Sequence, residues 1–250
     1  ARVVPGTRIP CYAFDNNTDL ASHVAETIAA LVRERNAIGQ NAVLGLPTGS
    51  TPLGVYRELA RMHREEGLDL SRVITFNLDE YFGIQPDQLQ SFNRWMFENF
   101  FNHVNIPREN IHIPDGTVAP EEVEDFCRRY EAAIARAGGI DLQLLGIGRN
   151  GHIGFNEPFS VVNSRTRLCT LDPLTRKDAA SDFFSGENVP SNAITMGIGT
   201  ILDARKIILI ALGEHKASII RETAEEPTTD RVPASFLHGH PDASLLLDTA

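Results

Sequence analysis

The fold is decided by one stretch, Ala42-Val-Leu-Gly-Leu-Pro-Thr-Gly-Ser-Thr-Pro52. Residues 42–46 form a short apolar run, which is typical of a strand buried inside a parallel sheet. A loop with one glycine, two prolines and three hydroxyl side chains follows, and helical periodicity then runs from about Leu53 to Arg64. A strand that leads through a short loop directly into a helix is the first half of a β-α-β crossover. The stretch therefore predicts an α/β protein.

The same alternation of strand and helix continues on both sides of this unit. We predict further strands at residues 9–14 (at a sheet edge), 73–78, 141–147, 193–197, 206–212 and 244–247. We predict further helices at residues 19–35, 91–103, 121–137, 172–184 and 214–224. Strands that are followed by helices pair in parallel, and helices cover both faces of such a sheet. Since no repeat or linker interrupts the pattern, we expect residues 1–250 to form one Rossmann-like domain with a mainly parallel sheet.

Composition limits the possible partners of this chain. The 250 residues carry 33 acidic and 23 basic side chains without any basic block, so neither nucleic acid nor an anionic membrane is an expected partner. The longest apolar run, residues 207–212, is too short to span a membrane, and Pro5-Gly6 interrupts the N-terminal stretch before a signal-like core forms. We therefore expect a cytoplasmic protein that binds a small molecule. The sequence is compatible with a homo-oligomer.

Neither the cysteines nor the paired histidines predict a metal site. Cys11, Cys127 and Cys169 are odd in number and scattered, and no CxxC pair occurs among them. His238-Gly-His240 has no further ligand at a suitable spacing. We expect three reduced thiols and no bound metal.

Three unusual loops follow predicted strands, and ligands of open α/β sheets bind beyond the carboxyl ends of strands. The first is the loop at residues 47–52, in which Gly49 allows a close backbone approach. This loop is either a turn in which Ser50 or Thr51 caps the next helix, or a cradle for phosphate or sugar hydroxyls at the positive end of that helix. It matches neither the Walker pattern nor GxGxxG, so a nucleotide is not indicated.

The second loop, Asn77-Leu-Asp-Glu-Tyr81, places two carboxyl groups where a buried strand leaves the core. The pair is either a solvated acidic cap or the location of a base that removes a proton from carbon. A carboxylate works best as such a base when burial and a neighbouring negative charge raise its pKa.

The third loop, Gly148-Arg-Asn-Gly-His-Ile-Gly-Phe-Asn-Glu-Pro158, is dense in glycine and chemically rich. Asn150, His152 and Glu157 can converge in it, which gives an imidazole two possible orienting partners. Among the eight histidines of the chain, His152 alone has such a setting. We therefore take it as a candidate proton shuttle rather than a structural side chain.

These three loops resemble the signatures of the glucosamine-6-phosphate deaminase family, which also includes glucosamine/galactosamine-6-phosphate isomerases. Ser164-Arg-Thr-Arg167, Thr195-Met-Gly-Ile-Gly-Thr200 and Leu212-Gly-Glu-His-Lys216 are similar to the family in the same order. The resemblance covers nearly the whole chain from about Ala42. The Asn-Glu-Pro ending of the histidine loop distinguishes it from the related 6-phosphogluconolactonases.

The resemblance implies an enzyme that isomerises and deaminates glucosamine 6-phosphate, giving fructose 6-phosphate and ammonia without an organic cofactor or metal. It implies that Asp79 moves a proton between C2 and C1, and that His152 opens the ring. Glu157 would orient this histidine together with Asn150, which stands where the family commonly has aspartate. Because an amide carries no charge, we expect Glu157 to bear more of this task. Substrate binding would involve the following residues: Thr48, Gly49, Ser50, Thr51 and Lys216.

Two positions depart from the family pattern. Asp182, in Ser181-Asp-Phe-Phe184, stands where the family has a phosphate-binding arginine, which calls the phosphate contacts into question. Cys169 stands where allosterically regulated members carry a lysine, although Ser160 and Arg167 match. We therefore expect weak or absent activation by an N-acetylated sugar phosphate.

Three alternatives remain open at the level of sequence. The first is a substrate that is another amino sugar, phosphorylated or not, as Asp182 suggests. The second is a 6-phosphogluconolactonase-like hydrolase, which the Asn-Glu-Pro ending disfavours. A non-catalytic sugar-phosphate sensor is the third alternative, although no DNA-binding segment is apparent.

Overall fold

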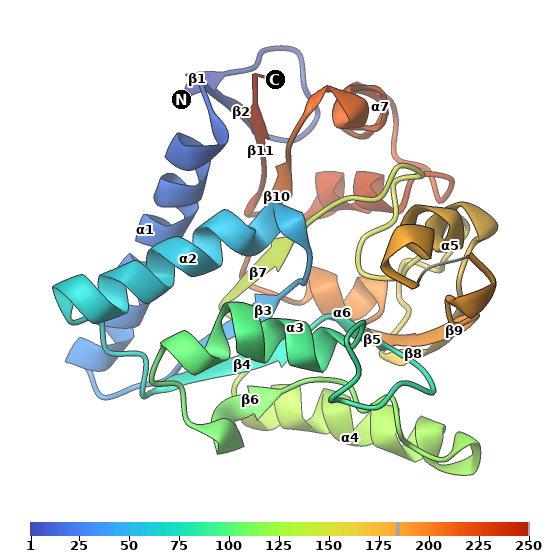
Figure 1. The fold of residues 1–250 in the computed structure, drawn as a ribbon. Helices are drawn as coiled ribbons and strands as arrows, with labels where there is room; N and C mark the ends of the chain where they lie inside the picture. Colours follow the sequence, from blue (N-terminus) through green and yellow to red (C-terminus); the bar gives the residue numbers. More distant parts are fainter. Residues whose placement is uncertain (184–185, 250) are drawn as a thin grey trace.

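The computed structural model describes residues 1–183 and 186–249, and it confirms the predicted α/β class (Figure 1). Its centre is an eight-stranded sheet in the order β1-β2-β11-β10-β7-β3-β4-β6. All neighbouring pairs in this sheet are parallel except β1 and β2. Its strands are β1 (Arg2–Val3), β2 (Cys11–Phe14), β3 (Ala42–Leu46), β4 (Val73–Asn77), β6 (Ile111–His112), β7 (Leu142–Leu145), β10 (Lys206–Ala211) and β11 (Ala243–Asp248).

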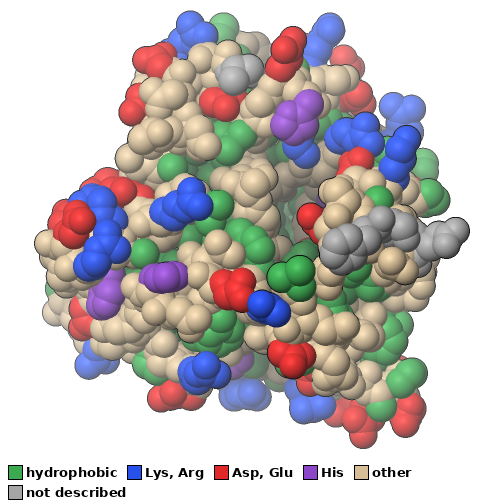
Figure 2. Space-filling view, viewed as in Figure 1, with side chains coloured by type: hydrophobic (Ala, Val, Ile, Leu, Met, Phe, Trp, Pro, Cys, Tyr) green, Lys and Arg blue, Asp and Glu red, His purple; other side chains and the backbone are tan. Residues whose placement is uncertain are grey.

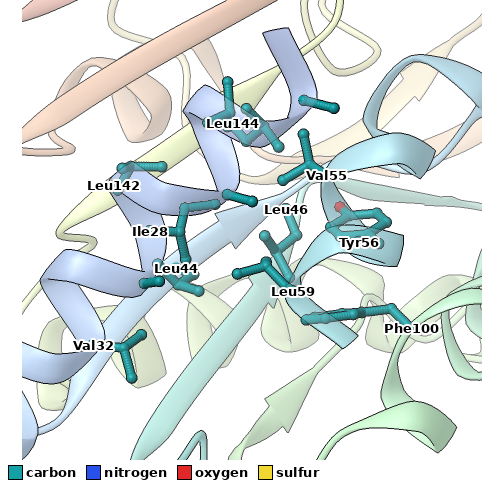
Figure 3. Packing of buried hydrophobic residues seen from close by; sticks show 14 of the residues in the cluster. Ile28, Val32, Leu44, Leu46, Val55, Tyr56, Leu59, Phe100, Leu142 and Leu144 are labelled. Atoms are coloured by element: carbon teal, nitrogen blue, oxygen red, sulfur yellow. The ribbon is translucent and has the colours of Figure 1, made fainter. Parts of the chain in front are cut away.

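Helices cover both faces of the sheet, as predicted. They are α1 (Asn17–Ala37), α2 (Ser50–Glu66), α3 (Phe92–Asn99), α4 (Val123–Arg136), α5 (Pro173–Ala179), α6 (Ile198–Leu202) and α7 (Ala217–Glu225). Helices α1, α2 and α3 pack on one face, where Ile28, Tyr56 and Phe100 join the strand residues Leu44 and Leu142 in one core (Figure 3).

The alternation of strand side chains produces the second core. Val43 and Leu145 point to the opposite face from Leu44 and Leu142, because successive strand residues face opposite ways. They pack with Tyr130 of α4, and α6 and α7 contribute to the same cluster. Burial on both faces explains why β3 and residues 207–211 of β10 read as continuous apolar runs.

A small antiparallel sheet was not predicted from the sequence. It has the order β5-β9-β8 and contains β5 (Asp79–Tyr81), β9 (Asn192–Thr195) and β8 (Arg167–Thr170). The predicted strand at 73–78 thus ends at Asn77, and the chain enters this second sheet at Asp79. Strand β8 escaped prediction because its residues are alternately half-buried and exposed, so that no apolar run marks it.

Several boundaries differ from the predictions for local reasons. The strand predicted at the sheet edge, β2, is covered by the two-residue β1. The helix predicted at 91–103 breaks at Phe100, whose φ of −142° is not helical. The helix predicted at 172–184 ends at Ala179 and continues as a 3-10 turn, Ala180–Phe183, while Phe184 lies outside the described residues. A further 3-10 turn, Glu214–Lys216, precedes α7.

None of the helices in the described ranges combines the length and the apolar character that crossing a membrane requires.

Gly197, at the start of α6, lies very close to the backbone of the segment that leads into β8. A Cβ built on Gly197 would lie 2.0 Å from the carbonyl oxygen of Ser164, which belongs to the segment that leads into β8. The obstacle is backbone rather than a flexible side chain, so it cannot move away cheaply.

We therefore expect Gly197→Ala to lower the free energy of unfolding by about 2–3 kcal/mol, as overpacking commonly does. Denaturant-induced unfolding measures this difference. The control is Gly239→Ala, because a Cβ built on Gly239 meets no atom within 4 Å. Equal stability of the two variants would contradict the close approach.

Candidate active site

The carboxyl ends of β3, β4, β7 and β10 open into one cavity of about 360 Å³. Figure 2 shows the molecule hollowed on this face, with Lys and Arg side chains gathered on part of the rim. The residues that line the cavity are Pro47, Thr48, Gly49, Thr51, Leu78, Asp79, Tyr81, Phe92, Gly146, Ile147, Gly148, Arg149, His152, Gly154, Phe155, Thr175, Asp178, Ala179, Asp182 and Lys216.

Most of the predicted site residues meet at this cavity. Asp79 and His152 line the same space, together with Thr48, Gly49, Thr51 and Lys216. Asn150 and Glu157 lie behind His152, and Ser50 is exposed at the start of α2. A larger cavity of about 690 Å³ lies between α4 and β8, but none of the predicted catalytic or substrate-binding residues lines it.

The loop after β3 presents the start of α2 to the cavity. Gly49 has a φ of 109° and occupies the N-cap position, and no described side chain caps the helix there. The proposed capping role of Ser50 or Thr51 is therefore wrong, because the helix already begins at Ser50. The first N–H groups of α2 remain available to an anion, which favours the cradle interpretation. The hydroxyl of Tyr56 donates to the carbonyl of Pro47 and holds the loop in place.

Asp79 is a buried carboxyl group at the bottom of the cavity, with 7% of its surface exposed. Burial raises the pKa of Asp79 to about 8, and the negative charge of Glu80 contributes in the same direction. Both causes penalise the charged form. A carboxylate with such a pKa is basic enough to take a proton from carbon near neutral pH.

Glu80 points away from the cavity and fixes the neighbouring backbone. Its two carboxylate oxygens accept four hydrogen bonds of 3.0 Å, from Ser91 Oγ and the backbone N–H groups of Tyr81, Phe92 and Asn93. Burial raises the pKa of Glu80, and these hydrogen bonds oppose that rise. The side chain thus connects β5 to the first turn of α3 and places a negative charge next to Asp79.

The glycines of the third loop make room for the imidazole. A Cβ on Gly148 would lie 2.1 Å from His152 Cε1, so a larger residue would displace the ring. Gly151 has a φ of 86° and Gly154 one of 58°, in the left-handed region that favours glycine. The glycine density of this segment therefore has a direct structural reason.

A chain of hydrogen bonds fixes the tautomer of His152. Asn150 Nδ2 donates to Glu157 Oε2 over 2.9 Å, so Asn150 Oδ1 faces His152 Nδ1 at 2.8 Å. Because this oxygen can only accept, Nδ1 must carry the ring proton. The Nε2 atom is then left with a lone pair and can act as a base.

Thr175 completes the support of the ring, and sequence reasoning missed it. Its hydroxyl donates to Glu157 Oε1 over 2.7 Å and lies 3.4 Å from His152 Nδ1. Glu157 itself approaches Nδ1 only to 3.9 Å. The direct orienting contact therefore comes from Asn150, in contrast to the expectation for Glu157. No motif marks Thr175, which lies on the short helix α5.

Burial and a nearby cation keep His152 uncharged. Burial lowers the pKa of His152 to about 4, and the charge of Lys216 adds to this effect. The imidazole is consequently neutral at physiological pH. The cavity thus combines an acid with a raised pKa and a base with a lowered one, a pattern typical of acid–base catalysis.

Besides Asp79, two basic and two acidic side chains are among the described residues that line the cavity. Lys216 is half-buried, its Nζ donates to the carbonyl of Ile147 over 2.6 Å, and burial lowers its pKa. Arg149 is paired with Asp178. Asp182 also lines the cavity, so its acidic side chain faces the space that a substrate would occupy.

Cys169 lies beside the site without a charge. Its thiol is half-buried, contacts the carbonyl of Phe155, and burial raises its pKa to about 12. Arg167 next to it donates to Asn156 Oδ1 over 2.8 Å and to Ser160 Oγ over 3.3 Å. A neutral thiol thus occupies the position at which the resemblance implies a lysine in regulated members.

The sequence and the fold of this chain are similar to those of known proteins. The family model described as glucosamine-6-phosphate isomerases/6-phosphogluconolactonase matches residues 15–246. The chain is 48% identical over 233 residues to a glucosamine-6-phosphate deaminase of Thermoanaerobacter pseudethanolicus, covering 93% of this chain and 90% of the relative. A solved monomeric glucosamine-6-phosphate deaminase superposes with a TM-score of 0.91 at 40% identity, covering 96% of this chain and 97% of that one. The 6-phosphogluconolactonase of Thermotoga maritima has a TM-score of 0.75 at 23% identity, covering 96% and 99%, and shares the fold.

The raised pKa of Asp79 predicts a cost in stability. Its pKa is higher in the folded state than in the unfolded chain, so the folded state binds more protons and stability falls as pH rises from about 4 to about 8. Each unit of this interval is worth about 1.4 kcal/mol.

We therefore expect Asp79→Asn to be more stable than the wild type at pH 8, and the gain to shrink as the pH falls towards 4. Denaturant unfolding at pH 5 and pH 8 measures it, with the exposed Asp87→Asn as control. A stability difference that does not change with pH would contradict the assigned environment of Asp79.

Proposed function

The chain belongs to the family of glucosamine-6-phosphate isomerases and 6-phosphogluconolactonases, and we propose that it is an enzyme that converts glucosamine 6-phosphate and water into fructose 6-phosphate and ammonia. One observation carries the proposal: the buried carboxyl of Asp79 and the neutral imidazole of His152 line the same cavity. The similarity to curated glucosamine-6-phosphate deaminases over most of the chain supports the same substrate.

His152 opens the sugar ring in the first step. Its Nε2 lone pair takes the proton of the C1 hydroxyl and returns it to O5 while the C1–O5 bond breaks, which yields the open-chain aldehyde. The imidazole ends the step neutral, so it needs no permanent charge. Asn150 and Thr175 hold the ring for this transfer, and Glu157 acts through both of them.

Asp79 then moves a proton between two carbons. As a carboxylate it removes the proton from C2 while O1 takes up a proton, so that the aldehyde becomes an enolamine; the proton from C2 is then returned at C1 while the nitrogen gives up a proton. The product of this step is a ketimine at C2. A carboxylate suits both directions of the transfer, since its raised pKa makes it a stronger base and its acid form is readily populated.

Water completes the reaction by adding to C2, after which ammonia leaves and the ketone of fructose 6-phosphate remains. Carbon 1 is reduced while carbon 2 is oxidised, so the electrons balance within the sugar. The chemistry therefore asks for no external electron acceptor. We place the protein accordingly among hydrolases of C–N bonds in amino-sugar catabolism, in the cytoplasm, where charged sugar phosphates are retained.

Phosphate binding is assigned to the start of α2 and to Lys216. The N–H groups after Gly49 lack a described side-chain cap, and Lys216 lines the same cavity. Thr48 and Thr51 offer hydroxyls to the sugar or its phosphate. The neutral thiol of Cys169 supports our expectation of weak or absent activation by an N-acetylated sugar phosphate.

Ammonia release from glucosamine 6-phosphate tests the proposed function. We expect turnover with this substrate, little with glucosamine, and no acid release from 6-phosphogluconolactone. Other amino-sugar phosphates in the same panel test the alternative substrates, and binding without turnover would indicate a sensor.

We expect Asp79→Asn to lower kcat by about 10³-fold, because the amide cannot take the proton. Its expected gain in stability at pH 8 separates this loss from unfolding. An Asp79→Asn variant with wild-type turnover would rule out the assigned base.

The pH dependence of kcat/KM gives a second test. Because Asp79 must be ionised to act as the base, we expect activity to rise through a pKa of about 8, whereas His152, with a pKa of about 4, remains neutral over this range. Glu80→Gln removes the negative charge beside Asp79 and should move the midpoint to lower pH.

The substrate amine titrates identically with both enzymes, so it cancels in this comparison. The maximal kcat/KM of Glu80→Gln should also be lower, because glutamine accepts fewer hydrogen bonds than the four that Glu80 accepts. If the midpoint of the pH profile were the same in both enzymes, this would contradict the electrostatic role of Glu80.

A further inference from the structure

We propose that Arg149 is the second cation that binds the substrate phosphate, and that Asp178 holds its guanidinium in the free enzyme until the phosphate replaces it. The inference rests on the proposed function, because it assumes a phosphorylated substrate in this cavity.

The charge of the cavity creates the need for a second cation. Besides Asp79, the acidic side chains of Asp178 and Asp182 line it, and Arg149 and Lys216 are the cations among its described lining residues. A phosphate dianion that enters with Lys216 as sole cation would meet an excess of negative charge. Among the described lining residues, Arg149 is the further cation that can compensate this negative charge.

The order of the strands places Arg149 between the other expected phosphate ligands. Strand β7 lies between β3 and β10 in the sheet. The loop after β3 carries Gly49 and the start of α2, and the turn after β10 carries Lys216. Arg149 follows β7 and therefore projects from the middle of these three loops, at the same carboxyl edge.

Arg149 and Lys216 are close enough for their charges to interact. Burial lowers the pKa of Lys216, the negative charge of Asp178 raises it, and the positive charge of Arg149 lowers it to a smaller extent. Two cations held near each other repel, and a dianion between them removes that repulsion. The two cations therefore favour an anion between them.

The present partner of Arg149 is one that a phosphate can displace. The guanidinium donates to both carboxylate oxygens of Asp178, with Nε at 2.9 Å from Oδ2. Both side chains are more than two-fifths exposed, and exposed ion pairs add little stability. A guanidinium binds phosphate through the same two parallel hydrogen bonds, and a dianion attracts it more strongly than a carboxylate does.

The other basic side chains of this region are directed elsewhere. The guanidinium of Arg176 donates to the carbonyls of Gly186 and Val189. Neither Arg176 nor Lys177 belongs to the described lining of the cavity.

Binding of inorganic phosphate, measured by calorimetry on the whole chain, tests the inference without requiring turnover. We expect Arg149→Gln to weaken binding about tenfold or more, since it removes a charged hydrogen-bond donor. We expect Asp178→Asn to tighten binding by up to about fivefold, because the competing carboxylate is gone. The control is Arg94→Gln. It breaks a similar exposed ion pair, with Glu98, and neither residue belongs to the described lining of the cavity.

Kinetics provide the second readout. Arg149→Gln should raise KM for glucosamine 6-phosphate, whereas the control Arg94→Gln should leave this KM unchanged. Absence of phosphate binding by the wild type, or equal binding by wild type and Arg149→Gln, would overturn the inference. Binding that depends on Arg149 without ammonia release from glucosamine 6-phosphate would instead support this inference and overturn the proposed function.

Discussion

The parallel pairing of β4, β3, β7 and β10 is the constraint on which the rest of the structure depends. Because parallel strands all end at the same edge, this pairing brings together loops that are far apart in the sequence. The carboxyl of Asp79, the imidazole of His152 and the ammonium of Lys216 reach one cavity for this reason. Helices α1, α2 and α3 on one face and α4, α6 and α7 on the other exclude water from the sheet and hold the edge rigid. A shift of one strand by a single residue would point its side chains to the other face of the sheet, and the site residues would no longer lie together.

Burial at this edge sets the chemistry. The same low dielectric raises the pKa of Asp79 and lowers that of His152, so each group lies nearer to its uncharged form than it would in water. Neighbouring charges act in the same sense, Glu80 on the carboxyl and Lys216 on the imidazole. The fold thus retains a buried carboxyl group at a cost in stability. Such a cost is expected for a group that takes part in the reaction. Hydrogen bonds around His152 serve a different purpose, since they choose its tautomer and leave Nε2 free.

Much of this could be predicted from the sequence, because its signals are local. The mainly apolar segments at β3, β4, β7 and β10 and the three loops after strands indicated the fold class and predicted that Asp79 and His152 lie at one edge. The strand predicted at 193–197 is β9, but its pairing into a separate small sheet was missed, because β5 has only three residues and β8 alternates between half-buried and exposed positions. Thr175 and Asp178 were missed because they approach the site from α5, which no motif links to the histidine loop. The relative roles of Asn150 and Glu157 depend on distances of 2.8 and 3.9 Å, which a sequence cannot reveal.

A crystal structure of the enzyme with a reduced, open-chain analogue of glucosamine 6-phosphate tests the central claim most directly. The analogue cannot form the aldehyde, so it remains bound in the geometry of the opened substrate. Our account predicts that its C2 lies against the carboxyl group of Asp79, its O5 within hydrogen-bond distance of His152 Nε2, and its phosphate between Lys216 and the start of α2. An analogue bound in this cavity with C2 turned away from Asp79, or with O5 out of reach of His152, would contradict it.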